Sequence, residues 1–475
     1  MAEEEDDAKE MEADQNERLL NEIRGLPWSQ FMAHEFMRGF APDYHSDSYS
    51  SGLLKIQTFM KTPRELEKTL AIGFLLCLDS FLFIFTLLPI RIIMAALYFF
   101  RNLTLYSYQI CDVLRGLVFL ICCIFIRNLD ISVIYHVIRG QSVIKLYVIF
   151  NILDILDKLF ASFGQDILDT LFWTTTQFKK GKGNKFQVIQ YFILCVLYVF
   201  LHTILVLVQS VTLNVAVNSH SKALLTIIVS NQFVELKGSV FKRFDRFNLY
   251  QMSCADARER FQNFILISIV CLRNLTQYAY STDYFWELVP DFLMVMVSEV
   301  LVDWVKHAFI TKFNNISAEV YLDYREALAR DVAVSRRLDS HSHHSDLICR
   351  RMGLTPLPIG CLIYRVMAQS ITITGKYQVF IATIVYLMLI LTKIVNSRFI
   401  LANAAHYLRK AKERRCKADS KNTKAERHDS VSAPYDRSSK KDVNTSSDTE
   451  LRQRVKPVIT LDTIDRYTLC SNRIV

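Results

Sequence analysis

Several apolar segments of this chain are long enough to cross a lipid bilayer. Residues 69–90 form a run of 22 residues with a single charge, Asp79. At 1.5 Å per residue, a helix of this length rises roughly 30 Å, the thickness of the bilayer core. Residues 187–217 are more apolar still, and His202 is their only side chain that can become charged near neutral pH. Similar segments occur at residues 106–126, 261–272, 285–305, 354–373 and 379–395.

The composition agrees with a bundle of long apolar helices. Hydrophobic residues make up 51% of the 475, whereas glycine and proline number only 13 and 9. The mean hydropathy is +0.19, above the range of soluble proteins whose charges are evenly spread. We therefore predict an all-α, multi-pass transmembrane helical bundle of six to eight spans, with interfacial amphipathic helices and disordered termini. The higher count allows residues 187–217 to turn back through residues 223–234.

The charge distribution divides the chain into three regions. Residues 1–36 are predicted to be an acidic, disordered N-terminus, residues 37–410 a multi-span membrane domain with cytosolic amphipathic loops, and residues 411–475 a basic, disordered tail. The first 17 residues hold nine acidic side chains and one lysine, which is not the basic start of a secretory signal peptide. An internal apolar segment is therefore expected to direct membrane insertion.

Lysine and arginine in the loops predict the sidedness of the spans. Residues 218–260 carry seven of these side chains and residues 306–351 carry eight, whereas residues 276–290 carry none. Because cytosolic loops are enriched in positive charge, we expect the first two regions and both termini to be cytosolic. The same bias accounts for the net charge of +9, so the lipid bilayer rather than nucleic acid is the predicted partner.

The sequence gives little reason to expect a catalytic or metal-binding centre. The 11 cysteines are odd in number and most lie in apolar runs, where a thiol behaves as a small hydrophobe. His341, His343 and His344 are adjacent, but no acidic or cysteine cluster stands beside them, so they are interpreted as a solvated loop. No zinc-protease, phosphate-loop or hydrolase motif is found. We predict no enzyme, no cofactor and no metal.

Residues 144–173 are predicted to form an amphipathic helix outside the main spans. Apolar side chains such as Ile152, Leu159 and Phe163 recur at helical spacing on one face, and Gly164 is expected to end the helix before a second one begins near residue 167. Such a helix can lie in the membrane interface or pack against the bundle. Partner binding is the alternative, and the candidate contact residues are Asp154, Asp157, Lys158, Gln165 and Asp166.

Four acidic side chains share an arc of about 160° on the predicted span at residues 285–305. They are Glu287, Asp291, Glu299 and Asp303. A carboxylate in hydrocarbon costs about 2.5–3.5 kcal/mol, so this face should look toward protein or water. One interpretation is a cation or proton route, with Arg365 or Lys393 as partners. The other places Glu287 and Asp303 at the two interfaces and leaves Asp291 and Glu299 in buried pairing.

Four blocks of the sequence resemble one known family. They begin with YHVIRGQSVIKLYVIF (135–150), TLNVAVNSHSKALLTI (212–227), KHAFITKFNNISAEVY (306–321) and RRMGLTPLPIGCLIYR (350–365). Together they are similar to the transmembrane anterior posterior transformation protein family, also described as cytomegalovirus-receptor-like. The similarity extends over residues 37–410, in order, and leaves out both termini.

This resemblance implies a multi-pass protein of the endoplasmic reticulum and of the centrosome or ciliary basal body. It also implies roles in primary cilium formation and in axial patterning during development, and a SUN-domain-like membrane glycoprotein as a partner, as in a fungal relative. The family has no established catalytic residues to carry over. We therefore expect a scaffold or adaptor whose cytosolic loops, residues 144–173 and 219–260, bind partners.

Two other functions remain open. A transporter or ion channel would use Asp291 and Glu299 on the acidic span. A membrane-embedded lipid enzyme would need histidines or paired acids in a compact motif at an interface, and the sequence shows none.

Overall fold

The computed structural model describes residues 27–37, 46–102, 105–218, 233–277, 282–336, 347–370 and 375–431, and these ranges form helices joined by short turns. The chain divides into two compact units, residues 1–55 and 56–475. The first unit contains α2 (Trp28–Met37) and the start of α3 (Ser46–Phe85). Apart from the bounds of α2 and α3, the description below concerns the second unit. The prediction of an all-α membrane protein is confirmed.

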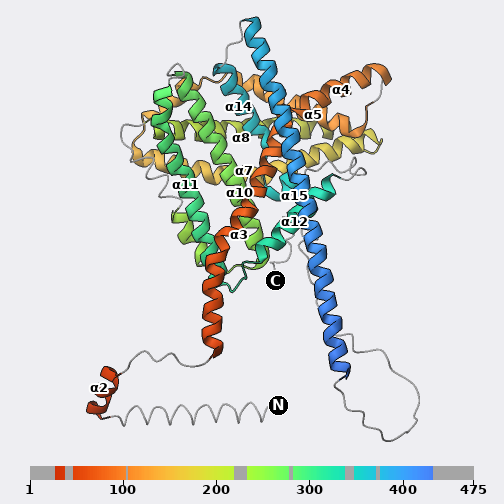
Figure 1. Ribbon diagram of the computed structural model, residues 1–475. Helices are drawn as coiled ribbons and strands as arrows, with labels where there is room; N and C mark the ends of the chain where they lie inside the picture. The colour runs from red at the N-terminus through yellow and green to blue at the C-terminus, as the bar shows by residue number, and fades with distance from the viewer. Residues whose placement is uncertain are drawn as a thin grey trace, which may run out of the picture. The chain divides into compact units, whose positions relative to one another are not determined.

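The remaining helices follow in chain order, with a further helical segment at residues 233–240 (Figure 1). They are α4 (Leu87–Asn102), α5 (Ser107–Arg127), α6 (Ile131–Arg139), α7 (Val143–Lys179), α8 (Lys185–Val217), α10 (Arg246–Gln277), α11 (Thr282–Phe313), α12 (Val320–Ser335), α13 (Leu347–Met352), α14 (Pro356–Ser370) and α15 (Lys376–Val431).

The core is organised around α8, which is apolar on all sides. One cluster of buried side chains joins α8 to α3, α10 and α12, through residues such as Leu70, Val211 and Phe261. A second cluster joins α8 to α5, α7 and α14, and includes Val199 and Cys361. A helix that is hydrophobic all round belongs in the interior of a bundle or in a membrane. Burial on both sides therefore explains why residues 187–217 are so apolar.

In the described part of the chain, four helical stretches are long and apolar enough to cross a membrane: Gly52–Phe85, Ser107–Arg127, Lys185–Val217 and Lys376–Lys417. They overlap four of the seven predicted segments. The other three lie on α10, α11 and α14. Because α14 has only 15 residues, it rises roughly 22 Å, less than the bilayer core. Most of residues 223–234 lie outside the described residues, so a count of six to eight spans stays a prediction.

Two predicted boundaries differ from the structure. The basic tail was expected to be disordered from residue 411, but α15 continues to Val431, so residues 411–431 are helical. Residues 432–475 lie outside the described residues. At the other end, α2 lies largely inside the region predicted to be disordered, residues 1–36, and is helical. α2 is rich in apolar residues, whereas residues 411–431 are mostly polar and charged.

The prediction that Gly164 ends a helix is wrong, because α7 runs through it without a break for 37 residues. α7 and α8 pack side by side (Figure 1), and Gly164 lies beside Tyr198 of α8 and Thr355, the residue before α14. A methyl group added at Gly164 would lie 2.0 Å from the Tyr198 hydroxyl and 2.4 Å from the Thr355 methyl group. The glycine therefore permits a close approach between helices and does not form a turn.

We expect Gly164→Ala to destabilise the protein by about 1–3 kcal/mol, the usual result of forcing extra atoms into a packed core. Thermal unfolding of the purified protein in detergent measures this. Gly238→Ala is a matched control, because nothing lies within 4 Å of the added methyl group there. Equal stability of the Gly164→Ala variant and the wild type would contradict this account of the packing.

Candidate functional site

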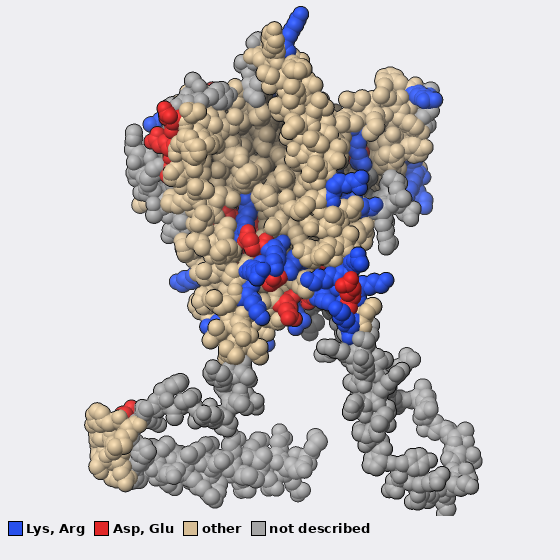
Figure 2. Space-filling view, viewed as in Figure 1, with Lys and Arg blue, Asp and Glu red and all other residues tan. Residues whose placement is uncertain are grey.

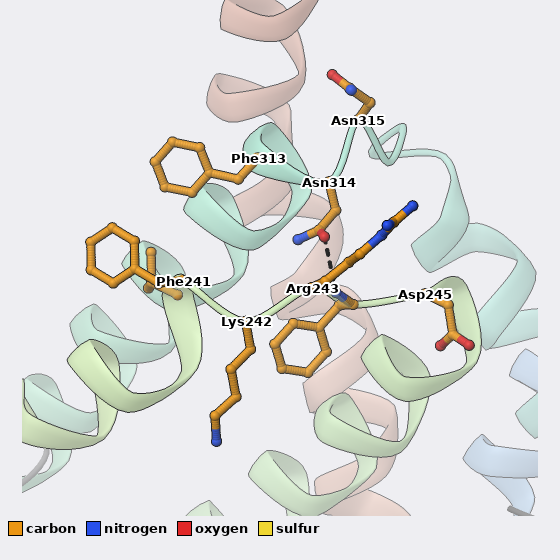
Figure 3. A pocket seen from close by; sticks show the side chains of 9 residues that line it. Phe241, Lys242, Arg243, Asp245, Phe313, Asn314 and Asn315 are labelled. Atoms are coloured by element: carbon orange, nitrogen blue, oxygen red, sulfur yellow. Dashed lines mark hydrogen bonds between the residues drawn. The ribbon is translucent and has the colours of Figure 1, made fainter. Parts of the chain in front are cut away.

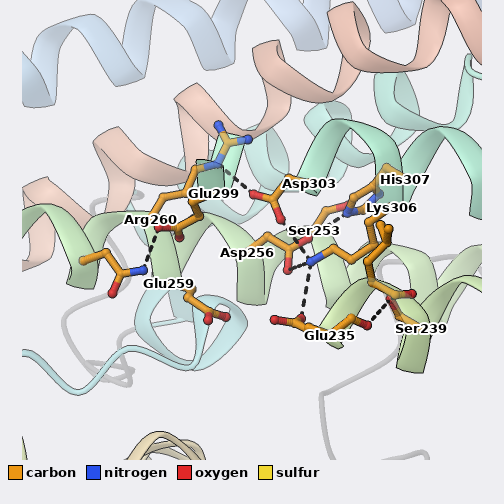
Figure 4. A network of polar contacts seen from close by, with 12 residues as sticks. Glu235, Ser239, Ser253, Asp256, Glu259, Arg260, Glu299, Asp303, Lys306 and His307 are labelled. Atoms are coloured by element: carbon orange, nitrogen blue, oxygen red, sulfur yellow. Dashed lines mark hydrogen bonds and ion pairs between the residues drawn. The ribbon is translucent and has the colours of Figure 1, made fainter. Parts of the chain in front are cut away.

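Charged side chains of α10 and α11 form a buried network (Figure 4). Asp256 lies 2.9 Å from Lys306 Nζ and 2.7 Å from His307 Nε2, and Asp303 lies 3.0 Å from the same ammonium group. Arg260 Nε donates to Asp303 Oδ2 at 2.9 Å. All five side chains are buried. Every one of these charges is therefore matched by an opposite charge from the neighbouring helix or the next turn.

The network follows from the spacing of charges on two antiparallel helices. Along α10, Asp256, Arg260 and Asn263 are separated by four and three residues, and so they share one face. On α11 the matching residues run in reverse order, so that Asn263 contacts Glu299, Arg260 contacts Asp303 and Asp256 contacts His307. The pairing fixes the register in which the two helices meet.

Side chains from α3 extend the network outward. Arg260 also donates to both carboxylate oxygens of Glu67 at 3.0 Å, and the Trp304 indole donates to Glu67 at 2.9 Å. Close by, Glu65 Oε2 forms an ion pair with Arg325 Nη2 of α12, at 2.6 Å. The long helix α3 is thus tied to α10, α11 and α12 by charge as well as by apolar packing.

Two histidines are held in the same way, each between an aspartate and a tyrosine. His307 has Asp256 at Nε2 and the Tyr321 hydroxyl at Nδ1, at 2.7 and 2.8 Å. His202 of α8 has Asp157 of α7 at Nε2 and Tyr198 at Nδ1, at 3.0 and 2.9 Å. Because both nitrogens of each ring are engaged, neither imidazole is available as a metal ligand or as a base for a substrate in this arrangement. These groups act as polar ties between helices.

The predicted acidic face on α11 is divided. Glu299 and Asp303 are buried in the network, whereas Asp291 is half-buried and Glu287 is exposed. Asp303 therefore does not lie at an interface with water. The suggested cationic partners lie elsewhere: Arg365 donates to the Leu129 carbonyl, and Lys393 contacts Asp79.

The cations that do pair with these acids, Arg260 and Lys306, were not predicted as site residues. The signal that could have found them is the spacing of opposite charges on α10 and α11, taken together with an antiparallel arrangement.

Four of the five predicted contact residues of α7 are buried or half-buried, and only Asp166 is exposed. Asp157 and Gln165 are buried, Asp154 and Lys158 are half-buried, and Asp166 is exposed. Buried side chains cannot form a contact surface, so Asp157 and Gln165 are corrected to internal residues. The exposed face of α7 is instead apolar, with Ile155, Leu159 and Phe163 between 52% and 63% exposed.

The acidic side of the network is not fully neutralised. Burial raises the pKa of the Glu259 carboxyl to about 7, against the attraction of Lys158, and Glu235 and Asp154 add repulsion. Burial also disfavours the charged form of Asp256, but Lys306 and His307 outweigh it and hold the pKa of this carboxyl below its ordinary value. Oxygens of Glu235, Asp256 and Glu259 lie within 4.8 Å of one another. Carboxyl groups therefore outnumber the nearby cations on the side of α10 that carries Glu259.

An open pocket of about 630 Å³ lies between residues 240–245 and the end of α11 (Figure 3). Lys242 and Arg243 are exposed beside it, and the rings of Phe241 and Phe313 stack with centroids 6.3 Å apart. Asn314 closes the inner side by accepting the Phe244 amide at 2.9 Å. Exposed cations next to exposed aromatic rings are typical of the boundary between a membrane and the cytosol.

These observations define a helical membrane protein with a charged internal network. Residues 105–409 match the model of a eukaryotic membrane protein family. The chain is 47% identical to the Mus musculus transmembrane anterior posterior transformation protein 1 over 412 residues, which cover 84% of this chain and 72% of that protein. It is 48% identical to the Homo sapiens homologue, over 81% of this chain and 69% of that protein.

A more distant relative is similar over nearly the same share of this chain. The Caenorhabditis elegans protein TAPT1 homolog is 41% identical over 82% of this chain and 55% of its own length. No solved structure matches. The chain belongs to the transmembrane anterior posterior transformation protein 1 family, as the four sequence blocks predicted.

We expect Asp256→Ala to destabilise the protein by roughly 3 kcal/mol or more, since it leaves an excess of buried positive charge. Asp303 remains beside Lys306, but it is shared with Arg260. Thermal unfolding in detergent provides the measurement. Adding Lys306→Met to the same chain should restore part of the loss, because the excess positive charge is then removed.

The matched control is Glu413→Gln, which breaks an exposed pair with Arg409 and should change stability by less than about 0.5 kcal/mol. If Asp256→Ala behaves like this control, the network does not hold the helices together.

Proposed function

We propose that this protein is a non-enzymatic scaffold or adaptor in the endoplasmic reticulum membrane, with a role in primary cilium formation and development. The observation that carries the proposal is the outward apolar face of α7. Support comes also from the network of α10 and α11, whose buried charges are paired within the protein. Residues paired in this way suit a framework better than a binding site for a substrate.

The orientation of α7 supports a contact surface. Most of the polar side chains at residues 154–165 pack inward, where Asp157 binds His202 and Lys158 lies 3.1 Å from Asp154, whereas Asp166 is exposed. Ile155, Leu159 and Phe163 are left on the outside, spaced as neighbours on one helix face. α7 is not among the stretches apolar enough to span a membrane. An apolar face on such a helix suits a protein partner at the level of the membrane interface.

The charged surface supports cytosolic termini. Blue and red atoms are densest in one band near α12 and α15, whereas the broad area above the band is mostly tan, with charged atoms chiefly toward its edges (Figure 2). In this region Glu326 of α12 pairs with Arg414 at 3.1 Å and Arg415 at 2.7 Å, both beyond the apolar part of α15. Lysine and arginine next to a span favour the cytosolic side. The C-terminal half of α15 would then enter the cytosol.

The partner that we propose is a SUN-domain-like membrane glycoprotein, as the family resemblance implies. Such a glycoprotein, being a membrane protein, would have an apolar span and flanking segments, and these could cover the exposed face of α7. Residence at the centrosome or basal body would follow from the cytosolic loops and tail. Residues 219–232, part of the predicted contact loop, lie outside the described residues.

Cation passage is a second candidate function, and the burial of Glu299 favours it. The carboxylate accepts a hydrogen bond from Asn263 at 2.7 Å, and its other oxygen has no partner among the described residues. Ion flux in reconstituted vesicles that disappears in the double variant Asp291→Asn, Glu299→Gln would establish a transporter or channel. Flux that is absent from the wild type would exclude this function and leave the scaffold.

For the scaffold, we expect the triple variant Ile155→Ala, Leu159→Ala, Phe163→Ala to lose the partner, because it removes most of the apolar contact area of α7. The measurement is recovery of the SUN-domain-like glycoprotein with the tagged protein from a detergent extract. Recovery should fall at least about fivefold, roughly 1 kcal/mol of binding free energy.

The matched control replaces three exposed apolar residues of the same spacing on α8, Ile189, Ile193 and Leu197, by alanine. This variant should keep the partner. Equal recovery with both variants would contradict a contact surface on α7.

A further inference from the structure

A small cavity lies between α7, α8, the helix at residues 233–240, α10 and α11. Its volume is about 60 Å³, enough for an ion and a bound water. Apolar side chains form part of the wall. The polar side chains that line it are Asp154, Gln209, Glu235, Glu259 and Asn263. All five offer oxygen atoms, and three of them are carboxylates.

Gln209 supplies an independent sign that a ligand belongs in this cavity. It lies on α8, on the wall of the cavity, and is 4% exposed. Its carbonyl oxygen has no hydrogen-bond partner in the described part of the chain. Leaving a buried acceptor unsatisfied costs about 1–3 kcal/mol. A cation in the cavity would satisfy this oxygen, which a neighbouring carboxylate cannot do.

The amide of Asn263 points to the same conclusion. Its nitrogen donates to Glu299, so its carbonyl oxygen is left as an acceptor on the cavity wall. The carboxylates of the cavity wall share the ammonium groups of Lys158 and Lys306, whereas the carbonyl oxygen of Gln209 has no hydrogen-bond partner in the described part of the chain.

The charges around the cavity do not balance. Lys158 lies 3.1 Å from Asp154 and 3.7 Å from Glu259, and so it is shared by two carboxylates. Lys306 lies 3.5 Å from Glu235 but closer to Asp256 and Asp303, at 2.9 and 3.0 Å. In Figure 4, Glu235 and Glu259 lie on the opposite side of Asp256 from His307. Asp154, Glu235 and Glu259 thus have the ammonium group of Lys158 and only part of that of Lys306 to balance their charge.

We propose that this cavity binds a hard divalent cation, with Ca²⁺ as the preferred ion, through Asp154, Glu235, Glu259 and the carbonyl oxygen of Gln209. Oxygen donors of mixed charge in an irregular arrangement are typical of Ca²⁺ sites, whereas Zn²⁺ sites use histidine and cysteine. The ion would join α7, α8, α10 and the helix at residues 233–240. This inference does not rest on the scaffold proposal, because it concerns an internal site and not the exposed face of α7.

The test is calorimetric titration of CaCl₂ into the full chain, purified in detergent and stripped with a chelator. One Ca²⁺ should bind per chain. Glu259→Gln and Gln209→Leu should each weaken binding roughly tenfold or more, because each removes one oxygen ligand. Lys158→Met should tighten it, since the competing ammonium is removed. Glu287→Gln, which changes an exposed carboxylate on α11, should bind as the wild type does.

A second measurement guards against variants that fold poorly. A ligand that binds only the folded state raises the unfolding temperature as its concentration increases. CaCl₂ should therefore stabilise the wild type and the Glu287→Gln variant but not Glu259→Gln. Absence of Ca²⁺ binding below millimolar concentration in the wild type, or equal affinity in Glu259→Gln, would overturn the proposal. Tighter binding of ZnCl₂ that depends on the same residues would also overturn it. Partner recovery by α7 is measured separately, so either proposal can fail alone.

Discussion

Burial of charge between α10 and α11 constrains the rest of this structure. A lone ion in a low-dielectric interior costs several kcal/mol, so each of Asp256, Arg260, Asp303 and Lys306 requires its partner in place. Sliding one helix by a turn would separate all the pairs at once. The ion pairs and hydrogen bonds between α10 and α11 are therefore compatible with one register of the two helices.

Apolar segments can be recognised in the sequence, whereas ion pairs depend on how the helices meet. This difference explains which features could be predicted from the sequence. Bilayer-length apolar runs identified α8 and the span of α15, because the hydrophobic effect acts on segments as a whole. The same reasoning predicted that the acidic face of α11 should look toward protein or water, and Glu299 on this face is buried. The partners of the acids could not be predicted, since the meeting of Arg260 with Asp303 depends on the register of two helices. That register is a property of the folded chain.

Helix α7 shows a second limit of the sequence pattern. Its periodicity correctly indicated two faces, but not which one turns inward. In a soluble protein the apolar face is buried, and around a membrane that expectation is reversed when charges such as Asp157 find internal partners. Gly164 illustrates the same point on a smaller scale. A glycine marks either a turn or a close contact, and here the nearness of Tyr198 decides for the contact.

The attachment of α15 bears on how this protein meets membranes of different thickness. Lys393 is fastened to Asp79 of α3, and Arg414 is fastened to Glu326 of α12. The two anchors are 21 residues apart along one continuous helix, or roughly 31 Å. Because ion pairs hold α15 at two depths, the helix resists tilting. Tilting is a common way in which a span adapts to a thinner bilayer. The surrounding lipid must then deform instead, which costs free energy. This cost favours residence in membranes whose thickness already matches the length of the span.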